Sequence, residues 1–299
     1  MRKWLLLFCT ALLFFGGACT QQREETGQSS SASVSSEADS AAASSQIFKA
    51  EEKTQEIPAP DFASCFQEVN GGAVLHDAAS GETWLYQDEL CTQRVSPYST
   101  FKIISALIGL ESGVLSDVSD TMTYSGAQYR NPQWNRELTL QEAFSSSCVW
   151  YFRQVLDEAG REQVQVVLNK LSYGNCDISE WEGSGVNPMP ELNGFWLSSS
   201  LLISPKEQVD VLWTLFEEGD GFDSENIALL KQLMRLEEKA GAVLYGKTGT
   251  GPEGQGWFVG FLEKNEERKY ISVYLPGPAS GSESSGNMAR EITEQLLKF

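Results

Sequence analysis

The chain has 299 residues, of which 41% are hydrophobic and 21% are charged, and its formal net charge at pH 7 is −19. This negative charge argues against nucleic acid as a partner and against contact of the folded part with anionic lipid. His76 is the sole histidine and no Cys-x-x-Cys pair occurs, so the composition also argues against a zinc site.

The single histidine also argues against a Ser-His-Asp triad. It would have to use His76, which lies in a predicted strand (AVLHDA, 73–78), and the sequence contains no G-x-S-x-G turn to carry the serine. We expect His76 to be a structural residue, and we expect neither a metal nor a separate cofactor.

The N-terminus has the pattern of an export signal. Two basic residues precede an apolar run (4–15), which is too short for a membrane span of about 20 residues. The following GGAC (16–19) resembles a bacterial lipobox, although an ordinary cleavage site is the alternative reading. We predict a signal peptide in residues 1–18 and lipidation of Cys19. The protein would then be secreted and anchored to the extracytoplasmic face of a bacterial cell membrane, with the lipid as its only membrane contact.

Composition divides the rest of the chain into two parts. Residues 19–60 are rich in Ser and Ala and include the low-complexity stretch SSSASVSSEADSAAASS, which predicts a flexible tether. Residues 61–299 contain seven of the eight tryptophans and regular apolar periodicity. They are enough for a large core, and we predict that they form the catalytic domain.

The first elements of this domain are two strands and a helix. The strands lie within residues 71–87 and are joined by a turn at Ser80 and Gly81. An almost wholly apolar helix follows over residues 96–110, with Pro97 near its start, where proline is tolerated.

The middle of the domain is predicted to be helical. Thr139 with Glu142, and Ser204 with Glu207, each form a capping box that marks the start of a helix. The predicted helices span residues 141–160, 161–171 and 205–218.

Three strands and a helix close the chain. The strands are predicted over residues 241–249, 256–263 and 269–276, and the helix over 287–299. Strands at both ends with helices between them predict an α+β domain, with one antiparallel sheet built from both termini and a helical lobe.

The apolar helix carries two reactive side chains, Ser99 and Lys102, which share one face because they are three residues apart. A serine needs an adjacent base to act as a nucleophile, and a lysine can be that base when burial keeps its amine neutral. Apolar neighbours such as Phe101 and Ile103 supply that burial. The pattern S-x-x-K alone is weak.

Three further motifs follow STFK (99–102) in order: SCV (147–149), YGN (173–175) and KTG (247–249). With GWFVG (256–260) and FWLSSSLLISPKEQV (195–209), the set resembles the penicillin-recognising serine acyl-transferases, and class D (oxacillinase-type) β-lactamases in particular. It also resembles the penicillin-sensing domain of the receptor that induces β-lactamase. The resemblance covers residues from about 65 to the C-terminus. Class A enzymes would show S-D-N at the second motif.

The resemblance implies four catalytic residues. Ser99 would attack the β-lactam carbonyl and form an acyl-enzyme. Lys102 would carry a carbamate derived from carbon dioxide (N6-carboxylysine), which acts as the general base. Ser147 and Lys247 would relay a proton to the β-lactam nitrogen.

The resemblance also implies the binding residues. Trp196 would donate its indole N–H to the carbamate, and backbone N–H groups of Ser99 and Thr250 would form the oxyanion hole. We expect the YGN motif to shape the loop beneath the site rather than to do chemistry. The residues expected to line the substrate site are Val149, Thr248, Gly249, Thr250 and Trp196.

Val149 bears on the choice between hydrolase and sensor. The resembling sensors carry Asn at this position, whose amide can hydrogen-bond the lysine and destabilise its carbamate, whereas valine keeps the pocket apolar. We therefore predict a β-lactamase that hydrolyses penicillin-type β-lactams. The alternatives are a non-hydrolytic penicillin sensor and a peptidoglycan D,D-transpeptidase or carboxypeptidase.

Two features depart from the family pattern or stay open. Class D enzymes place an arginine in the closing segment to bind the substrate carboxylate, and Arg290 lies one position late, so it is either that residue or a solvated helix residue. Four cysteines, Cys65, Cys91, Cys148 and Cys176, remain beyond the N-terminal segment and allow three pairings. Cys148 and Cys176 each adjoin a motif and either pair across the site or pack as small residues.

Overall fold

A computed structural model describes residues 59–219, 221–277 and 285–299. The predicted signal peptide (1–18), the lipidation site Cys19 and the tether up to residue 58 lie outside the described residues. Within the described ranges, no helix combines the length and apolar character needed to cross a membrane.

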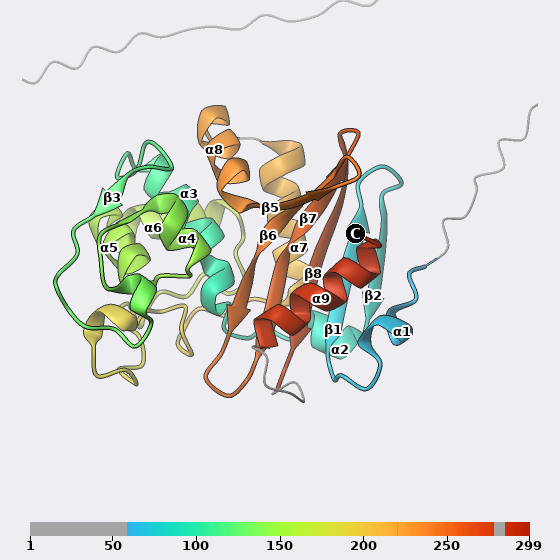
Figure 1. Cartoon of the computed structure of the whole chain (residues 1–299), viewed down its shortest axis with the longest axis horizontal. Coiled ribbons are helices and arrows are strands. Elements are labelled where there is room, and N and C mark those ends of the chain that lie inside the picture. The colour runs from blue at the N-terminus through green and yellow to red at the C-terminus, as the bar shows by residue number, and fades with distance from the viewer. Residues whose placement is uncertain (1–58, 220, 278–284) are drawn as a thin grey trace, which may run out of the picture. The chain divides into compact units, whose positions relative to one another are not determined.

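The centre of the domain is a six-stranded antiparallel sheet in the order β2-β1-β8-β7-β6-β5 (Figure 1). The first strand of the chain pairs with the last, so both ends of the domain build one sheet, as predicted. The strands are β1 (Gly72–Asp77), β2 (Glu82–Tyr86), β5 (Arg235–Lys239), β6 (Ala242–Thr250), β7 (Gly256–Lys264) and β8 (Glu267–Leu275).

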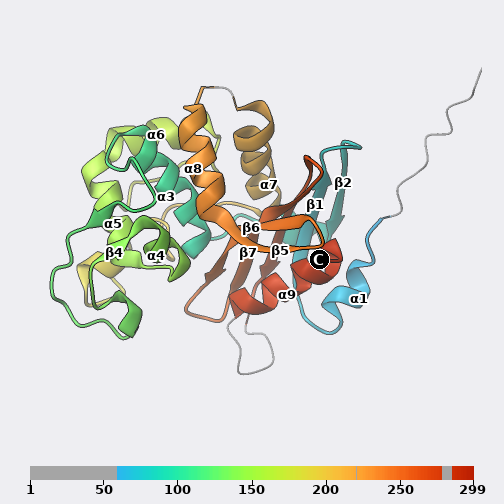
Figure 2. The same cartoon turned by 45° about the horizontal axis from the view of Figure 1, so that its top comes forward.

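Both faces of this sheet are covered, which explains the unbroken runs of buried residues in β7 (256–261) and β8 (270–275). Alternate residues of a strand point to opposite faces. Ala73 and Leu75 are therefore buried in one cluster with α9 (Ser285–Leu297), while Val74 is buried in the cluster on the other face, with α7 (Pro205–Trp213). Figures 1 and 2 show α9 and α7 on these opposite faces. The short helix α1 (Phe62–Phe66) adds to the α9 side.

A helical lobe lies beside the sheet, around a central helix whose residues from Lys102 to Leu110 are all buried. The remaining helices between β2 and β5 are α2 (Asp88–Thr92), α3 (Lys102–Glu111), α4 (Leu140–Ser145), α5 (Val149–Ala159), α6 (Arg161–Lys170) and α8 (Ser224–Met234). A two-stranded sheet of β3 (Thr121–Met122) and β4 (Leu138–Thr139) belongs to the lobe, where β3 contacts α5 and β4 contacts α4.

Both predicted capping boxes are confirmed. In each box the hydroxyl accepts from the backbone N–H three residues on, and the glutamate carboxylate returns to the backbone N–H of the capping residue. The helix predicted over 205–218 is α7 continued by a π-helical turn (Thr214–Glu218). Helix α8 and strand β5 are present without having been predicted.

Two predicted helices were wrong in detail. The helix expected over 96–110 begins with a 3-10 turn (Tyr98–Phe101), and its α-helical part starts at Lys102. The helix expected over 141–160 is broken at residues 146–148. Ser147 has a left-handed φ of 56°, and the Cys148 N–H donates to the Ala143 carbonyl at 2.8 Å. Serine is a weak helix former, because its hydroxyl competes for backbone groups, and the hydroxyl of Ser146 indeed donates to the Glu142 carbonyl.

Candidate active site

Three parts of the chain bring the predicted catalytic residues together: the start of α3, the junction of α4 and α5, and β6. The Lys102 Nζ donates to the Ser99 Oγ at 3.1 Å. The Lys247 Nζ donates to the Ser147 Oγ at 2.5 Å and to the Thr248 carbonyl at 2.9 Å. Each serine hydroxyl therefore has a lysine amine as its neighbour, although the two pairs come from distant parts of the sequence.

The Lys102 amine is wholly buried among apolar side chains. Its exposed fraction is 0%, and its Nζ lies 5.8 Å from the centroid of the Phe152 ring. Burial penalises the charged form and lowers the pKa of Lys102 to about 8. About a tenth of the amine is therefore neutral at pH 7 and about half at pH 8, and only the neutral amine can act as a base or a nucleophile.

Lys247 has a similar environment. Its exposed fraction is 5%, and its Nζ lies 5.8 Å from the centroid of the Phe144 ring. Burial, and secondly the positive charge of Lys102, lower the pKa of Lys247 to about 7. Near pH 7 the amine is therefore present in both its neutral and its protonated form.

Trp196 offers a hydrogen-bond donor that is not used. Its indole is fully buried and packs against Phe101 and Phe195, and its Nε1 has no partner among the described residues. An unpaired buried N–H is costly. The site therefore suits an additional acceptor, as a carbamate on Lys102 would be. Gly194 makes room for the ring, because a Cβ there would lie 2.2 Å from it.

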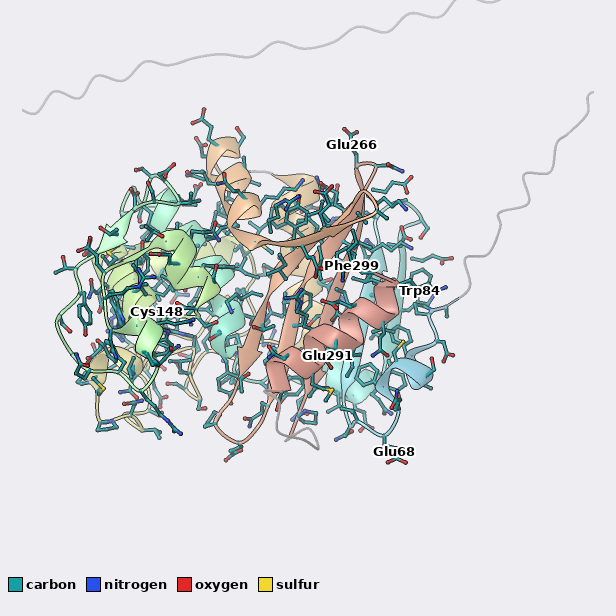
Figure 3. The ribbon with its side chains drawn as sticks, in the orientation of Figure 1. Glu68, Trp84, Cys148, Glu266, Glu291 and Phe299 are labelled. Carbon is teal, nitrogen blue, oxygen red and sulfur yellow. The ribbon has the colours of Figure 1, made fainter. Side chains whose placement is uncertain are left out.

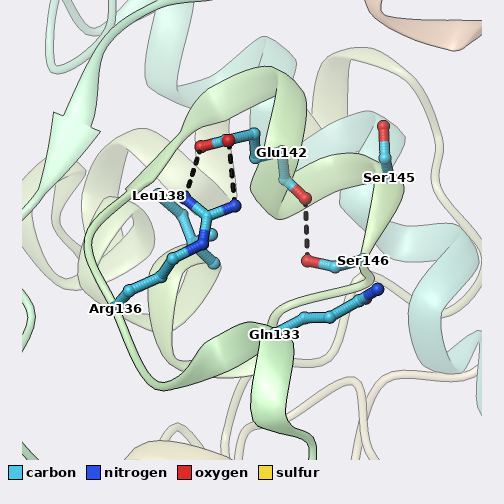
Figure 4. A pocket seen from close by; sticks show the side chains of 6 residues that line it. All are labelled: Gln133, Arg136, Leu138, Glu142, Ser145 and Ser146. Carbon is cyan, nitrogen blue, oxygen red and sulfur yellow. Dashed lines mark hydrogen bonds and ion pairs between the residues drawn. The ribbon is translucent and has the colours of Figure 1, made fainter.

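The turn that carries Ser147 is supported from the helical lobe. The Trp134 Nε1 donates to the Ser146 carbonyl at 3.0 Å, next to the left-handed Ser147. Beside this turn lies a cavity of about 310 Å³, in which the Arg136 guanidinium is bound by the Glu142 carboxylate (Figure 4). The role of Trp134 was not predicted from the sequence, because no local pattern links a tryptophan in one segment to a serine in another.

The KTG strand forms the other wall. The pairing of β5 with β6 ends at Tyr245. Residues 246–250 of β6 therefore have no strand partner on that side. Gly249 lies against the 3-10 turn of Ser99, since a Cβ there would be 3.3 Å from the Pro97 carbonyl oxygen. Thr248 is partly buried and Thr250 is exposed, and the Thr250 Oγ1 accepts from the Gly286 N–H at 3.3 Å. The Thr248 Cβ and the Thr250 Oγ1 both lie beside Gly286, the second residue of α9.

Comparison with known proteins agrees with this arrangement of the four motifs. A family model described as the penicillin binding protein transpeptidase domain matches residues 36–298. The chain belongs to this family.

Relatives of two kinds are similar to it. It is 37% identical to the probable β-lactamase YbxI of Bacillus subtilis, over 83% of this chain and 88% of that protein. A class D β-lactamase structure from Bacillus subtilis is 35% identical with a TM-score of 0.71, covering 80% of this chain and 94% of that one. The C-terminal domain of the BlaR penicillin-receptor of Bacillus licheniformis is 33% identical with a TM-score of 0.71, covering 81% and 97%. The predicted resemblance to class D β-lactamases and the predicted fold class are confirmed.

Within this penicillin-binding domain, Val149 begins α5 and is partly buried against the core of the helical lobe. Its side chain brings no hydrogen-bonding group to the site.

Arg290 is bound by acidic side chains. Its Nε donates to Glu294 at 2.7 Å and its guanidinium reaches Glu237 at 3.2 Å. Glu237 is paired in register with Leu244, three residues before Lys247. Arg290 was predicted to be either the arginine that binds the substrate carboxylate or a solvated helix residue. This arrangement matches the second role.

The YGN motif fixes the loop that carries Trp196. The Asn175 side chain donates to the Ser200 carbonyl at 2.8 Å and accepts from the Leu202 N–H at 2.9 Å. Gly174 has a left-handed φ of 55°, and a Cβ there would lie 1.9 Å from the Leu202 carbonyl oxygen, so no other residue fits.

All four described cysteines are free thiols, so none of the three open pairings is formed. Cys148 is buried within the helical lobe (Figure 3), where burial raises its pKa to about 12.

His76 is bonded to Thr83 on the neighbouring strand and packs edge-on against Trp213. No cluster of His, Cys, Asp and Glu suited to a metal occurs in the described part of the chain.

Proposed function

We propose that this protein is a class D-like β-lactamase, which hydrolyses penicillin-type β-lactams through an acyl-enzyme on Ser99. The observation that carries the proposal is the Lys102 amine, fully buried and 3.1 Å from the Ser99 hydroxyl. The unpaired N–H of Trp196 supports a carbamate on Lys102. When present, that group supplies the general base for acylation and deacylation.

The other residues support acylation. As Ser99 bonds to the β-lactam carbonyl carbon, negative charge develops on its oxygen, and the backbone N–H groups of Ser99 and Thr250 would stabilise it. Breaking the C–N bond requires a proton on the leaving nitrogen. Ser147 would deliver its hydroxyl proton there and be reprotonated by Lys247, whose lowered pKa suits that exchange. Thr248, Thr250 and Lys247 would bind the substrate carboxylate.

Val149 favours hydrolysis over sensing. A valine presents no amide to the lysine, so a carbamate there would keep its negative charge available to activate water. The similarity to the BlaR penicillin-receptor domain makes a sensor, acylated but not turning over, the second candidate.

We also propose export through the N-terminal signal and lipidation at Cys19. Replacing Cys19 with serine is expected to move the protein from the membrane fraction of cells into the medium or the extracytoplasmic soluble fraction. Retention of the Cys19→Ser variant on the membrane would contradict lipidation at this residue.

The decisive experiment mixes the purified protein with excess benzylpenicillin, with and without bicarbonate. We expect many turnovers per protein, a decline below pH 8 as Lys102 becomes protonated, and recovery when bicarbonate is added. Ser99→Ala is the inactive control. Consumption of one equivalent, leaving a stable adduct on Ser99, would support the sensor instead.

Lys102→Ala separates the two steps of the reaction. Without the lysine, we expect any acyl adduct on Ser99 to accumulate, because water is no longer activated, and intact-protein mass spectrometry would detect it. Retained turnover by a folded Lys102→Ala protein would exclude the carbamate mechanism.

A further inference from the structure

The nucleophile Ser99 follows a residue in an unfavourable backbone conformation. Tyr98 has a φ of 49°, in the left-handed region that a bulky side chain rarely adopts. Such conformations persist only where the surrounding structure holds them in place. The peptide unit between Tyr98 and Ser99 carries the Ser99 N–H, one of the two proposed oxyanion donors, so the Tyr98 conformation sets the direction of that donor.

The preceding peptide unit, Pro97–Tyr98, is held at both of its ends. Its N–H donates to the Trp196 carbonyl at 3.2 Å. Its carbonyl accepts from the Thr100 N–H at 3.2 Å and from the Thr100 Oγ1 at 2.7 Å. A peptide plane fixed at its nitrogen and at its oxygen has little freedom to rotate, which in turn restrains φ of Tyr98.

Gln208 determines what the Thr100 hydroxyl does. Its Nε2 donates to the Thr100 Oγ1 at 3.0 Å, and both side chains are buried, with exposed fractions of 3% and 1%. An amide nitrogen can only donate. The Thr100 oxygen accepts this bond, and its own hydroxyl proton is donated to the Pro97 carbonyl.

From this chain of contacts we propose that Gln208 is a positioning residue for acylation. Acting through Thr100, it holds the Pro97–Tyr98 peptide unit and so aims the Ser99 N–H at the carbonyl oxygen of the substrate. Gln208 lies in the first turn of α7, and the Ser204–Glu207 capping box immediately before it fixes where that turn begins. The inference rests on the proposed acylation of Ser99 but not on turnover, so it applies equally to a hydrolase and to a sensor.

The test measures the acylation step by itself. The purified full chain is mixed with a fluorescent penicillin, and the rate of adduct formation is followed at increasing concentration, which separates the first-order acylation rate from the Kd of the non-covalent complex. Removing an oxyanion donor altogether costs about 10²–10³ in rate. A donor that is only misdirected is expected to cost less, so Gln208→Met should lower the acylation rate about 10-fold and change Kd less than about twofold.

Matched variants identify the cause. Gln232→Met makes the same change on an exposed residue of α8 and should leave both constants unchanged. Thr100→Val, which removes the hydroxyl, should resemble Gln208→Met, whereas Thr100→Ser, which keeps it, should recover most of the rate. The double variant Gln208→Met/Thr100→Val should be no slower than the slower single variant, because both substitutions break one chain of contacts.

The outcomes are distinct. A folded Gln208→Met protein with the wild-type acylation rate, or with a loss confined to Kd, would overturn the positioning role. If Gln208→Met does not fold, equal rates for Thr100→Val and Thr100→Ser would do the same. A wild-type protein that neither forms an adduct nor hydrolyses the penicillin would overturn the proposed function and this inference together, and that failure is visible without any variant.

Discussion

At the scale of single residues, the site depends on two lysines that are buried without a carboxylate partner among the described residues. The described contacts of Lys102 and Lys247 are serine hydroxyls, one carbonyl and the faces of two phenylalanine rings. A buried charge is tolerated when it is paired, and neither amine is paired with an anion here. Their lowered pKa values follow from that environment. Keeping two such amines in the core lowers the free energy of unfolding.

Replacing Lys102 by methionine is therefore expected to stabilise the fold. The folded-state pKa of about 8 lies below the ordinary value of 10.5. The unfolded chain therefore binds the proton more tightly, and the penalty on the folded state grows as the pH falls from 10.5 to 8 and is constant below that. Removing the amine should raise the free energy of unfolding at pH 7 by about 3 kcal/mol.

Urea denaturation in carbon dioxide-free buffer measures this effect, with the exposed Lys264→Met as the matched control. A Lys102→Met protein less stable than wild type would show that the amine is stabilised by a partner that the described contacts do not provide.

The substrate carboxylate gives a second prediction at this scale. Because Arg290 is already bound by Glu237 and Glu294, Arg290→Ala should change KM for benzylpenicillin less than about twofold. Thr248→Val should raise KM about 10-fold, as expected for loss of a hydrogen bond to a charged group. Steady-state kinetics on both variants checks this, and a larger effect at Arg290 than at Thr248 would reverse the assignment.

At the scale of elements, local sequence signals predicted most of the helices and strands but not the break between α4 and α5. Apolar residues at helical spacing continue from Ala143 to Val155, so periodicity alone predicts one helix. What ends α4 is a left-handed Ser147, and one of its supports is the Trp134 indole, which comes from a separate 3-10 turn (Pro132–Trp134) before α4. Strand β5 was missed because its sequence RLEEK has no strand pattern and its strand conformation depends on pairing with β6. The catalytic residues were found because their motifs are short and ordered, whereas Gln208 and Trp134 act through contacts that no motif records.

The capping box of α4 allows a test of how much it stabilises the start of this helix. Thr139→Ala removes the acceptor for the Glu142 N–H and should lower the free energy of unfolding by about 1 kcal/mol. Thr139→Ser keeps the oxygen and should restore most of it. Thermal unfolding compares the three proteins. Equal stability of the Ala and Ser variants would mean that packing, and not the cap, sets where α4 begins.

At the scale of the whole molecule, the site is shared between the sheet and the helical lobe, while the start of the described chain packs elsewhere. Ser99, Lys102 and Ser147 come from the lobe, and Lys247 from β6. The helix α1 instead packs against the other end of the sheet, near the edge strand β2, as the positions of α1 and of Trp84 in β2 show (Figures 1 and 3). There Phe62 stacks on Tyr86 and Phe66 packs against it at a tilt, at 5.6 and 4.8 Å between ring centroids.

Two N-terminal truncations should consequently differ. A chain that begins at Ala59 keeps α1 and every catalytic contact, so its Tm and its rate of adduct formation with a fluorescent penicillin should match those of the full chain. A chain that begins at Val69 loses α1 and with it the buried Phe66 side chain, so the core residues that Phe66 contacts beside α9 become exposed. Because deleting a fully buried phenylalanine side chain typically costs about 3–5 kcal/mol, its Tm should fall by several degrees or more. Its acylation rate, measured well below that Tm, should change little, because α1 makes none of the contacts that position Ser99. A large loss of acylation in the chain that begins at Ala59 would instead mean that residues before 59 contribute to the site.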